Sequence, residues 1–164
     1  MAKPLFEYKL DVLLNEWRLV QAQISQFDTV ALSIRGWAVT VFGGILAVSA
    51  SIKQAGLVPF AALPIMLFWL IDALFKSFQS RVIGRSEEIE SYLRSDEFRK
   101  DAAQQTSFGF VSPRLADAFK LPIAVRLQDL VRALFYANVM LTYAALLIAC
   151  VMSYYVLSQI HFAK

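Results

Sequence analysis

The chain has 164 residues, of which 58% are hydrophobic and 18% charged, and its mean hydropathy is +0.53. Soluble domains are nearer ~45–50% apolar, so this excess indicates a membrane module rather than a larger soluble core. The chain has a single cysteine (Cys150), which excludes an internal disulfide. Because it also has a single histidine (His161), it has almost no residues that could form a metal centre or activate a nucleophile.

Residues 6–34 carry the most regular hydrophobic pattern in the chain. Apolar side chains recur at alternating spacings of four and three, which predicts a helix with one narrow apolar stripe. No proline or glycine interrupts the pattern before Gly36, so the helix is expected to run directly into the apolar stretch that follows. The heptad seam within the stripe is predicted to comprise Leu10, Leu13, Trp17, Val20, Ile24 and Phe27.

Three interpretations of this stripe compete. It can lie on the membrane surface, although the balanced charge of the opposite face argues against this. It can pack against the rest of its own chain, or it can pair between subunits, and the sequence does not separate these two.

Three stretches are apolar enough to cross a hydrocarbon core of ~30 Å. They run from Gly36 to Ile52, from Gln54 to Phe75 and from Ala133 to Ile160. We therefore expect an all-α membrane protein with three transmembrane helices, a long N-terminal amphipathic helix and a helical cytoplasmic loop. The predicted parts are a cytoplasmic heptad helix at 1–35, a transmembrane hairpin at 36–76, a cytoplasmic helical loop at 77–132, a third transmembrane helix at 133–160 and a short outer tail at 161–164.

Asp72 is an acid inside the second apolar stretch, in the run FWLIDALFKSF. Lys76 follows it by one helical turn, in the acid-first order that favours an i, i+4 pair. The preferred interpretation is therefore an interfacial carboxylate paired with Lys76. The alternative is a functional charge that faces an oligomer axis or Arg132 at the basic end of the third span.

The long loop after the second span carries helix signals of its own. Ser95 and the two acids that follow it predict a helix N-terminus. Ser112 and Pro113 predict the start of a short helix. From Ile123 onwards, an apolar spacing through Leu134 leads helically into the third span.

Lysine and arginine predict the orientation. Four of the 16 basic residues precede the first span and ten lie in residues 76–132, which leaves only Lys53 and Lys164 for the opposite side. The positive-inside rule then puts the N-terminus and the long loop in the cytoplasm and the C-terminus outside. We expect a multi-pass protein of a bacterial inner (plasma) membrane.

Small residues at intervals of four favour close helix packing in the spans. We expect two neighbouring faces of the first span to carry them, which would give partners on both sides and hence a homo-oligomer. Asn138 in the third span could add an interhelical hydrogen bond worth about 0.6 kcal/mol. The three ladders are Gly43, Ala47 and Ser51, then Gly36, Thr40 and Gly44, and finally Ala145, Ala149 and Ser153.

Motifs of catalysis are not found. The sequence lacks a glycine-rich phosphate loop, a nucleophile elbow and metal-ligand spacing, so we expect no enzyme activity, no cofactor and no catalytic or metal-binding residue. The expected partners are the lipid bilayer, further copies of the chain, and a cytoplasmic protein or nucleotide signal. The net charge of +3 is too modest to indicate nucleic acid.

The layout of about the first 95 residues resembles that of small hairpin effector membrane proteins of bacterial antiphage systems, the SLATT type among them. The resemblance lies in the run RGWAVTVFGGILAVSASIK and the FWLIDALFKSF that follows it. It implies an oligomer that disrupts or permeabilises the inner membrane when a cytoplasmic sensor is triggered. The third span departs from a two-span plan, and no functional residue can be carried over.

Two functions follow from these observations. The first is an oligomer that forms a pore or perturbs the membrane and is gated through its cytoplasmic helices. The second is a non-conducting scaffold or accessory subunit that docks a partner complex through the same helices.

Overall fold

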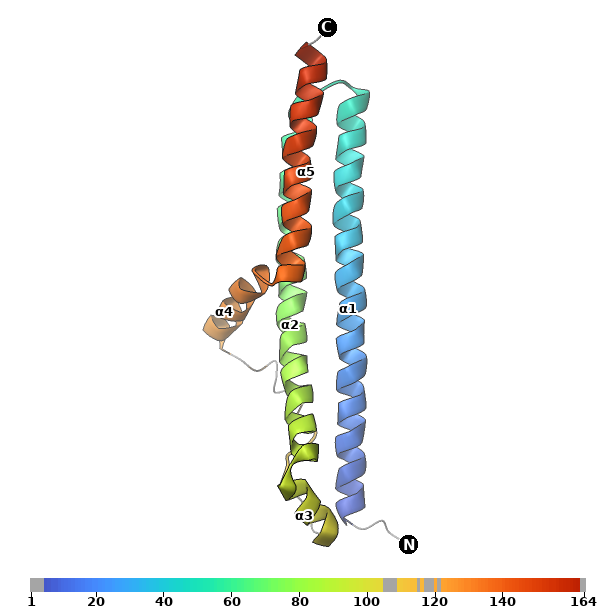
Figure 1. Cartoon of the computed structure of the whole chain (residues 1–164), viewed down its shortest axis with the longest axis vertical. Coiled ribbons are helices and arrows are strands. Elements are labelled where there is room, and N and C mark those ends of the chain that lie inside the picture. The colour runs from blue at the N-terminus through green and yellow to red at the C-terminus, as the bar shows by residue number, and fades with distance from the viewer. Residues whose placement is uncertain (1–4, 105–108, 115, 117–119, 121, 163–164) are drawn as a thin grey trace. The chain divides into compact units, whose positions relative to one another are not determined.

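The computed structural model of the chain describes residues 5–104, 109–114, 116, 120 and 122–162. The predicted all-helical fold is confirmed for these residues, and three of the helical stretches are long and apolar enough to cross a membrane. The elements, labelled in Figure 1, are α1 (Leu5–Ser51), the 3₁₀ helix η1 (Ala55–Ala61), α2 (Ala62–Arg94), α3 (Asp96–Gln104), α4 (Ile123–Leu134) and α5 (Ala137–Phe162).

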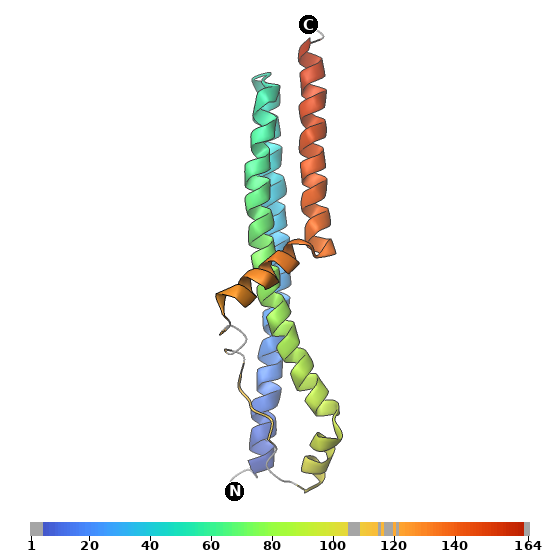
Figure 2. The ribbon, with the colours of Figure 1, turned by 90° about the vertical axis from the view of Figure 1, so that its left-hand side faces the viewer.

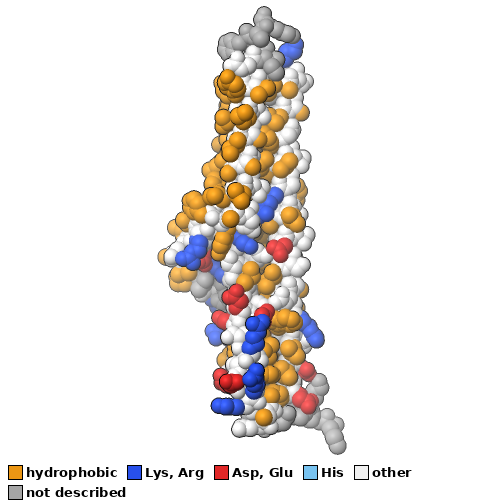
Figure 3. All heavy atoms as spheres, viewed as in Figure 1, with side chains coloured by type: hydrophobic (Ala, Val, Ile, Leu, Met, Phe, Trp, Pro, Cys, Tyr) orange, Lys and Arg blue, Asp and Glu red, His pale blue; other side chains and the backbone are white. Residues whose placement is uncertain are grey.

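The chain divides into two compact units. Unit 1 comprises Met1–Asp28 and Phe78–Arg126, and unit 2 comprises Thr29–Ser77 and Leu127–Lys164. On the face shown in Figure 3, hydrophobic side chains cover the helices of unit 2, whereas charged side chains gather on unit 1. The covalent link between the units includes α1, which is one unbroken helix of 47 residues as the sequence predicts.

The hydrophobic stripe of α1 packs within its own chain. Phe6, Leu13, Val20, Phe27 and Ile34, each seven residues from the next, are buried, and the intervening Leu10, Trp17 and Ile24 are half-buried. In unit 1, Phe6 and Leu13 form a core with Ile89 and Tyr92 of α2. Of the three interpretations of the stripe, intrachain packing is therefore the one that the structure shows.

Polar contacts between α1 and α2 follow a heptad register. In unit 1, Gln21 Nε2 donates to Ser86 Oγ (2.8 Å), and Gln79 Nε2 donates to Asp28 Oδ1 (2.7 Å). Seven residues forward along α1 therefore correspond to seven residues back along α2, the pattern of an antiparallel coiled-coil pair. Since polar side chains at such a seam tolerate few alternative partners, they specify the register.

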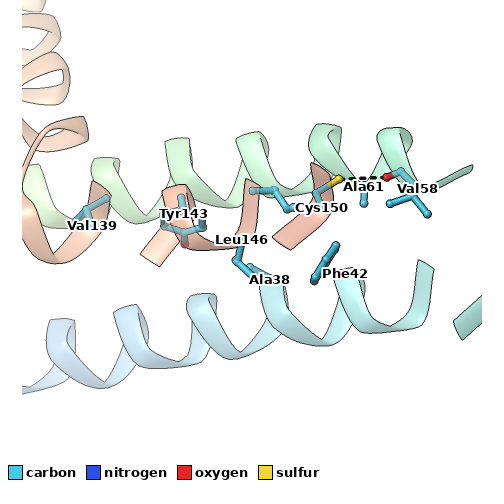
Figure 4. Close-up of a cluster of buried hydrophobic side chains, with 9 residues drawn as sticks. Ala38, Phe42, Val58, Ala61, Val139, Tyr143, Leu146 and Cys150 are labelled. Carbon is cyan, nitrogen blue, oxygen red and sulfur yellow. Dashed lines mark hydrogen bonds between the residues drawn. The ribbon is translucent and has the colours of Figure 1, made fainter. Parts of the chain in front are cut away.

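The core of unit 2 lies between the three apolar helices (Figure 4). At one end of this core, the Cys150 thiol donates a hydrogen bond to the carbonyl of Val58 at 3.3 Å. Lys53, which has a positive φ of 57°, lies in the turn between α1 and η1. The buried residues are Ala38, Phe42, Val58, Ala61, Ile65, Val139, Tyr143, Leu146 and Cys150.

The prediction that one helix leads from Ile123 into the third span is wrong. The helix ends at Leu134 and α5 begins at Ala137, so α4 turns away from α5 (Figure 2). The Leu134 carbonyl accepts a hydrogen bond from Trp69 Nε1 at 3.2 Å. In a continuous helix that carbonyl would accept from the backbone N–H four residues later, so the contact with Trp69 favours the break.

Of the two helix starts predicted in the long loop, the one at Ser95 is confirmed. The Ser95 hydroxyl accepts a hydrogen bond from the backbone N–H of Phe98 at 3.1 Å, which confirms it as the N-cap of α3. Ser112, Pro113 and Arg114 are not helical, and most of the residues that would continue the predicted short helix (115, 117–119) lie outside the described residues.

Candidate functional site

Asp72 is completely buried in unit 2 and pairs with Arg35. Its side chain belongs to α2, and Arg35 Nε of α1 lies 2.8 Å from Asp72 Oδ2. The preferred interpretation, a pair of Asp72 with Lys76, is therefore wrong, and Arg35 was not predicted because it lies 37 positions away in the sequence. The interpretation that Asp72 faces an oligomer axis is wrong, since a residue that is 0% exposed within one chain cannot contact a second copy. Lys76 Nζ lies over the ring of Tyr136, 5.9 Å from its centroid.

Helix α5 contributes Tyr143 to this polar cluster. The Tyr143 hydroxyl interacts electrostatically with both Asp72 and Arg35. Nevertheless, neither that hydroxyl nor Asp72 Oδ1 has a hydrogen bond of ordinary geometry within the part of the chain that the structure describes. The cluster therefore holds one strong contact, Arg35–Asp72, and a weaker interaction between Asp72 and the Tyr143 hydroxyl.

Unit 1 holds a second buried ion pair. Glu16 of α1 is 3% exposed and Arg85 of α2 is 7% exposed. The pair is bidentate, because Arg85 Nε and Nη2 lie 3.1 Å from Glu16 Oε1 and Oε2, respectively. Two planar hydrogen bonds between a guanidinium and a carboxylate are stronger and more specific than one, so this pair fixes the geometry of both helices.

The same ion pair ties the segment 109–114 to the helices. Glu16 accepts hydrogen bonds from the Ser112 hydroxyl and from the backbone N–H of Arg114, the latter at 2.8 Å. Arg85 Nη2 donates to the Val111 carbonyl at 2.9 Å, and the guanidinium stacks 4.9 Å from the centre of the Phe110 ring. Two helices and one irregular segment therefore share one charged centre.

Hydrogen bonding keeps the Glu16 carboxylate ionised. Burial on its own raises the pKa of Glu16, but hydrogen bonds from Arg85, Ser112 and Arg114 outweigh it and hold that pKa below the usual 4.5. Burial likewise lowers the pKa of Arg85, and contacts with Glu16 and Glu88 outweigh this effect and raise the pKa above its usual value. Both groups are therefore charged at neutral pH.

A cavity of about 640 Å³ adjoins this centre, lined among others by Arg85, Glu88, Tyr92, Phe110 and Arg114. Arg85 is its most buried cation, but four contacts already occupy that guanidinium, two of them with Glu16 and the others with Glu88 and the Val111 carbonyl. Since Arg has five N–H donors, little capacity remains for an anionic ligand.

The Glu16–Arg85 ion pair was not predicted, although the sequence contains a signal for Glu16. Glu16 lies three residues after Leu13 and four before Val20, both fully buried, so its side chain falls on the buried face of α1. An acid at such a position needs a buried partner. Arg85 could not be identified as that partner without the α1–α2 register.

The small residues of the first span do not pack within the chain. All six are exposed, and a Cβ added at Gly36, Gly43 or Gly44 would meet no atom within 4 Å. Intrachain packing is therefore not their role in this structure. In α5 the third ladder is split, because Ala149 packs partly against the core of unit 2 whereas Ala145 is exposed.

The prediction of two separate faces on the first span is wrong. Gly36 and Gly43 are seven residues apart in one continuous helix, and so are Gly44 and Ser51, so each pair lies almost directly in line two turns apart. The six residues consequently form one outward face, which we call the small-residue face: Gly36, Thr40, Gly43, Gly44, Ala47 and Ser51. It lies opposite the buried side of α1, which carries Ala38, Phe42 and Ser49.

An apolar hollow of about 380 Å³ borders the small-residue face. It is lined by Val41, Gly44, Ile45, Val48, Leu57 and Phe60, all in unit 2. Asn138 is also exposed, and its side-chain amide makes no hydrogen bond within the described part of the chain. Polar and concave features on an otherwise apolar surface are typical of helix association in membranes.

Comparison with protein-family models gave no match, and comparisons with curated proteins and with solved structures gave none either. Among the residues that the structure describes, no cluster of three or more His, Cys, Asp or Glu side chains could hold a metal ion.

Proposed function

We propose that this chain is a self-associating membrane protein that permeabilises or otherwise perturbs the bilayer and is gated through unit 1. The observation that carries the proposal is the small-residue face of α1, which is exposed in unit 2 and opposite the core. Lipid offers no hydrophobic drive between helices, so close backbone approach at small residues is a main source of association energy.

The proposed orientation follows from charge. Unit 1 contains most of the lysine and arginine, so the positive-inside rule assigns it to the cytoplasm of a bacterial cell and the C-terminus to the outside. A cytoplasmic stimulus would then act on unit 1 and reach the first span through the unbroken α1. A cytoplasmic protein or a nucleotide signal is the proposed stimulus.

The proposal is tested by tryptophan substitutions in the purified chain reconstituted in liposomes. Gly43→Trp and Ala47→Trp place a bulky ring on the small-residue face, and they are expected to reduce both chemical cross-linking between copies and the release of an encapsulated dye. Val39→Trp is the matched control, because Val39 is exposed on the same helix but lies beside that face and does not line the apolar hollow. A chain that is strictly monomeric in liposomes would contradict the proposal.

A non-conducting scaffold is the second candidate, and one observation favours it. Arg35 and Asp72 pair with each other within unit 2. The outward surface of α1 and α5 is largely apolar. A wide aqueous pore needs a polar lining. Cross-linking without any dye release, together with capture of one cytoplasmic partner at fixed ratio, would favour the scaffold over the pore.

The layout resemblance extends the proposal to defence against phage. The test is the plating efficiency of phages on cells that carry the chain or its Gly43→Trp variant. Protection that the substitution abolishes would support an antiphage effector, and equal plating in the absence and presence of the chain would contradict it.

A further inference from the structure

The helix α4 presents a stripe of large apolar side chains that no part of the described chain covers. Ile123, Leu127, Val131 and Phe135 recur every four residues, and their side chains are 83%, 60%, 49% and 66% exposed, respectively. Phe135 follows the last residue of the helix and extends the stripe. Spacing of four places these residues along one side of a helix.

The charged residues of α4 lie on the other side. Arg126, Asp129 and Arg132 recur every three residues, and at 100° per residue their mean direction is opposite that of the apolar stripe. Two bases and one acid give the helix a net charge of +1. An amphipathic helix of only 12 residues is too short to cross a bilayer but suits the plane of its surface.

The last residues of α4, which belong to unit 2, attach it to that unit. Ala133 is fully buried, and Leu130 and Leu134 are half-buried. The Leu134 carbonyl accepts the hydrogen bond from Trp69 of α2. The attachment is thus made by the C-terminal end of α4, and Ile123, Leu127, Val131 and Phe135 themselves stay exposed.

The place of α4 along the chain indicates what covers the stripe. Only Phe135 and Tyr136 separate it from α5, which is apolar and long enough to cross a membrane. Trp69, Lys76 and Tyr136 cluster at this junction through the contacts described above, and such residues favour the level of the lipid headgroups. The stripe is also continuous in sequence with the exposed apolar surface of α5, where Leu141 is 64% exposed.

We propose that α4 lies in the headgroup layer of the membrane, with Ile123, Leu127, Val131 and Phe135 inserted among the acyl chains and with its charged side in water. The occupant of the stripe is the lipid bilayer. The proposal does not depend on self-association or conduction, so it can fail or succeed independently of the function proposed above.

Site-directed spin labelling of the full chain in liposomes tests this placement. Because Cys150 is the only cysteine, a Cys150→Ser background allows single labels at chosen positions. Ile123→Cys, Leu127→Cys and Val131→Cys sample the stripe. Val125→Cys and Arg132→Cys sample the opposite side, and Val125 is the matched control because it is apolar and 38% exposed but lies off the stripe.

The measurement is the accessibility of each label to oxygen, which partitions into lipid, relative to a water-soluble nickel chelate. We expect this ratio to be several-fold higher at the three stripe positions than at Val125 and Arg132. Two results would overturn the proposal. In one, all five positions are equally accessible to nickel, so the helix is in water. In the other, the stripe is shielded from both reagents, so a second copy or another protein covers it.

Discussion

Glu16 joins three stretches of unit 1 that are far apart in the sequence. Its two carboxylate oxygens accept hydrogen bonds from Arg85, Ser112 and the backbone of Arg114. Breaking a buried ion pair by removing one partner costs more than replacing both, because the remaining charge is left without compensation. The two kinds of substitution therefore give different results.

Replacing Glu16 with Ala is expected to lower the stability of unit 1 by about 3 kcal/mol, because Arg85 then stays buried without its main partner. The double variant Glu16→Leu, Arg85→Leu should recover much of this loss in denaturant unfolding. In hydrogen exchange, however, it should lose protection at residues 109–114, whose anchors are gone. Equal stability of the single and double variants would contradict the role assigned to this pair.

Acid is expected to weaken the same contact. The folded-state pKa of Glu16 is below its usual 4.5, so the contribution of the carboxylate to stability is complete above that pH. It is lost as the pH falls from 4.5 through the lower folded-state value. Thermal unfolding between pH 7 and pH 3, compared with the Glu16→Gln variant, measures this, and the loss should be smaller in the variant. Identical acid sensitivity of both proteins would rule out Glu16 as a cause.

Thermal stability is expected to depend much more on the charge of Asp72 than on the hydroxyl of Tyr143. Asp72→Asn removes the charge that compensates Arg35 and should lower thermal stability in detergent micelles. Tyr143→Phe removes a buried hydroxyl whose interaction with Asp72 lacks ordinary hydrogen-bond geometry, so stability should change much less. A loss with Tyr143→Phe as large as that with Asp72→Asn would show that the hydroxyl has a partner.

At the scale of elements, α1 and α2 share a register that explains where polar residues can be buried. Arg35–Asp72 in unit 2 follows Asp28–Gln79 of unit 1 by seven residues on each helix. Asp72, Gln79 and Ser86 are all buried, and Ile65 begins the same series. The positions of the buried acid and amide in α2 thus follow from one heptad repeat.

The start of α3 offers a test of local structure. Ser95→Ala removes the acceptor of the Phe98 N–H and should destabilise the helix by about 1 kcal/mol, seen as faster hydrogen exchange over Asp96–Gln104. Ser91→Ala is the matched control, because that serine is exposed within α2. If both variants exchange alike, the capping contact does not contribute.

Local patterns in the sequence predicted some elements, and contacts between distant residues determined the rest. The stripe of α1, the three apolar spans and the Ser95 cap all depend on residues within a few turns of one another. The break between α4 and α5 was not predicted, and the contact that favours it comes from Trp69, 65 residues before the Leu134 carbonyl. The partner of Asp72 could not be predicted either, because Arg35 becomes its neighbour only through the pairing of α1 with α2.

The single small-residue face, in contrast, needed no distant contact. Ladders that begin seven residues apart coincide after two turns of any α-helix, so sequence spacing alone was sufficient to merge them. The structure adds that this face is exposed.

At the scale of the whole molecule, the two units divide the charged and the apolar parts of the chain. The ion pair Glu16–Arg85 belongs to unit 1, and the small-residue face and the Arg35–Asp72 pair belong to unit 2. Every functional proposal above requires that the apolar helices of unit 2 cross a bilayer. If all three candidate spans cross, an odd number of crossings puts the two termini on opposite sides of the membrane.

Topology mapping in cells tests this requirement most directly. A reporter that is active only in the cytoplasm and one that is active only outside it are fused in turn to the N-terminus, between residues 104 and 109, and to the C-terminus. We predict cytoplasmic activity at the first two positions and external activity at the third. Activity of all three fusions in one compartment, or recovery of the chain in the soluble fraction without detergent, would contradict the account.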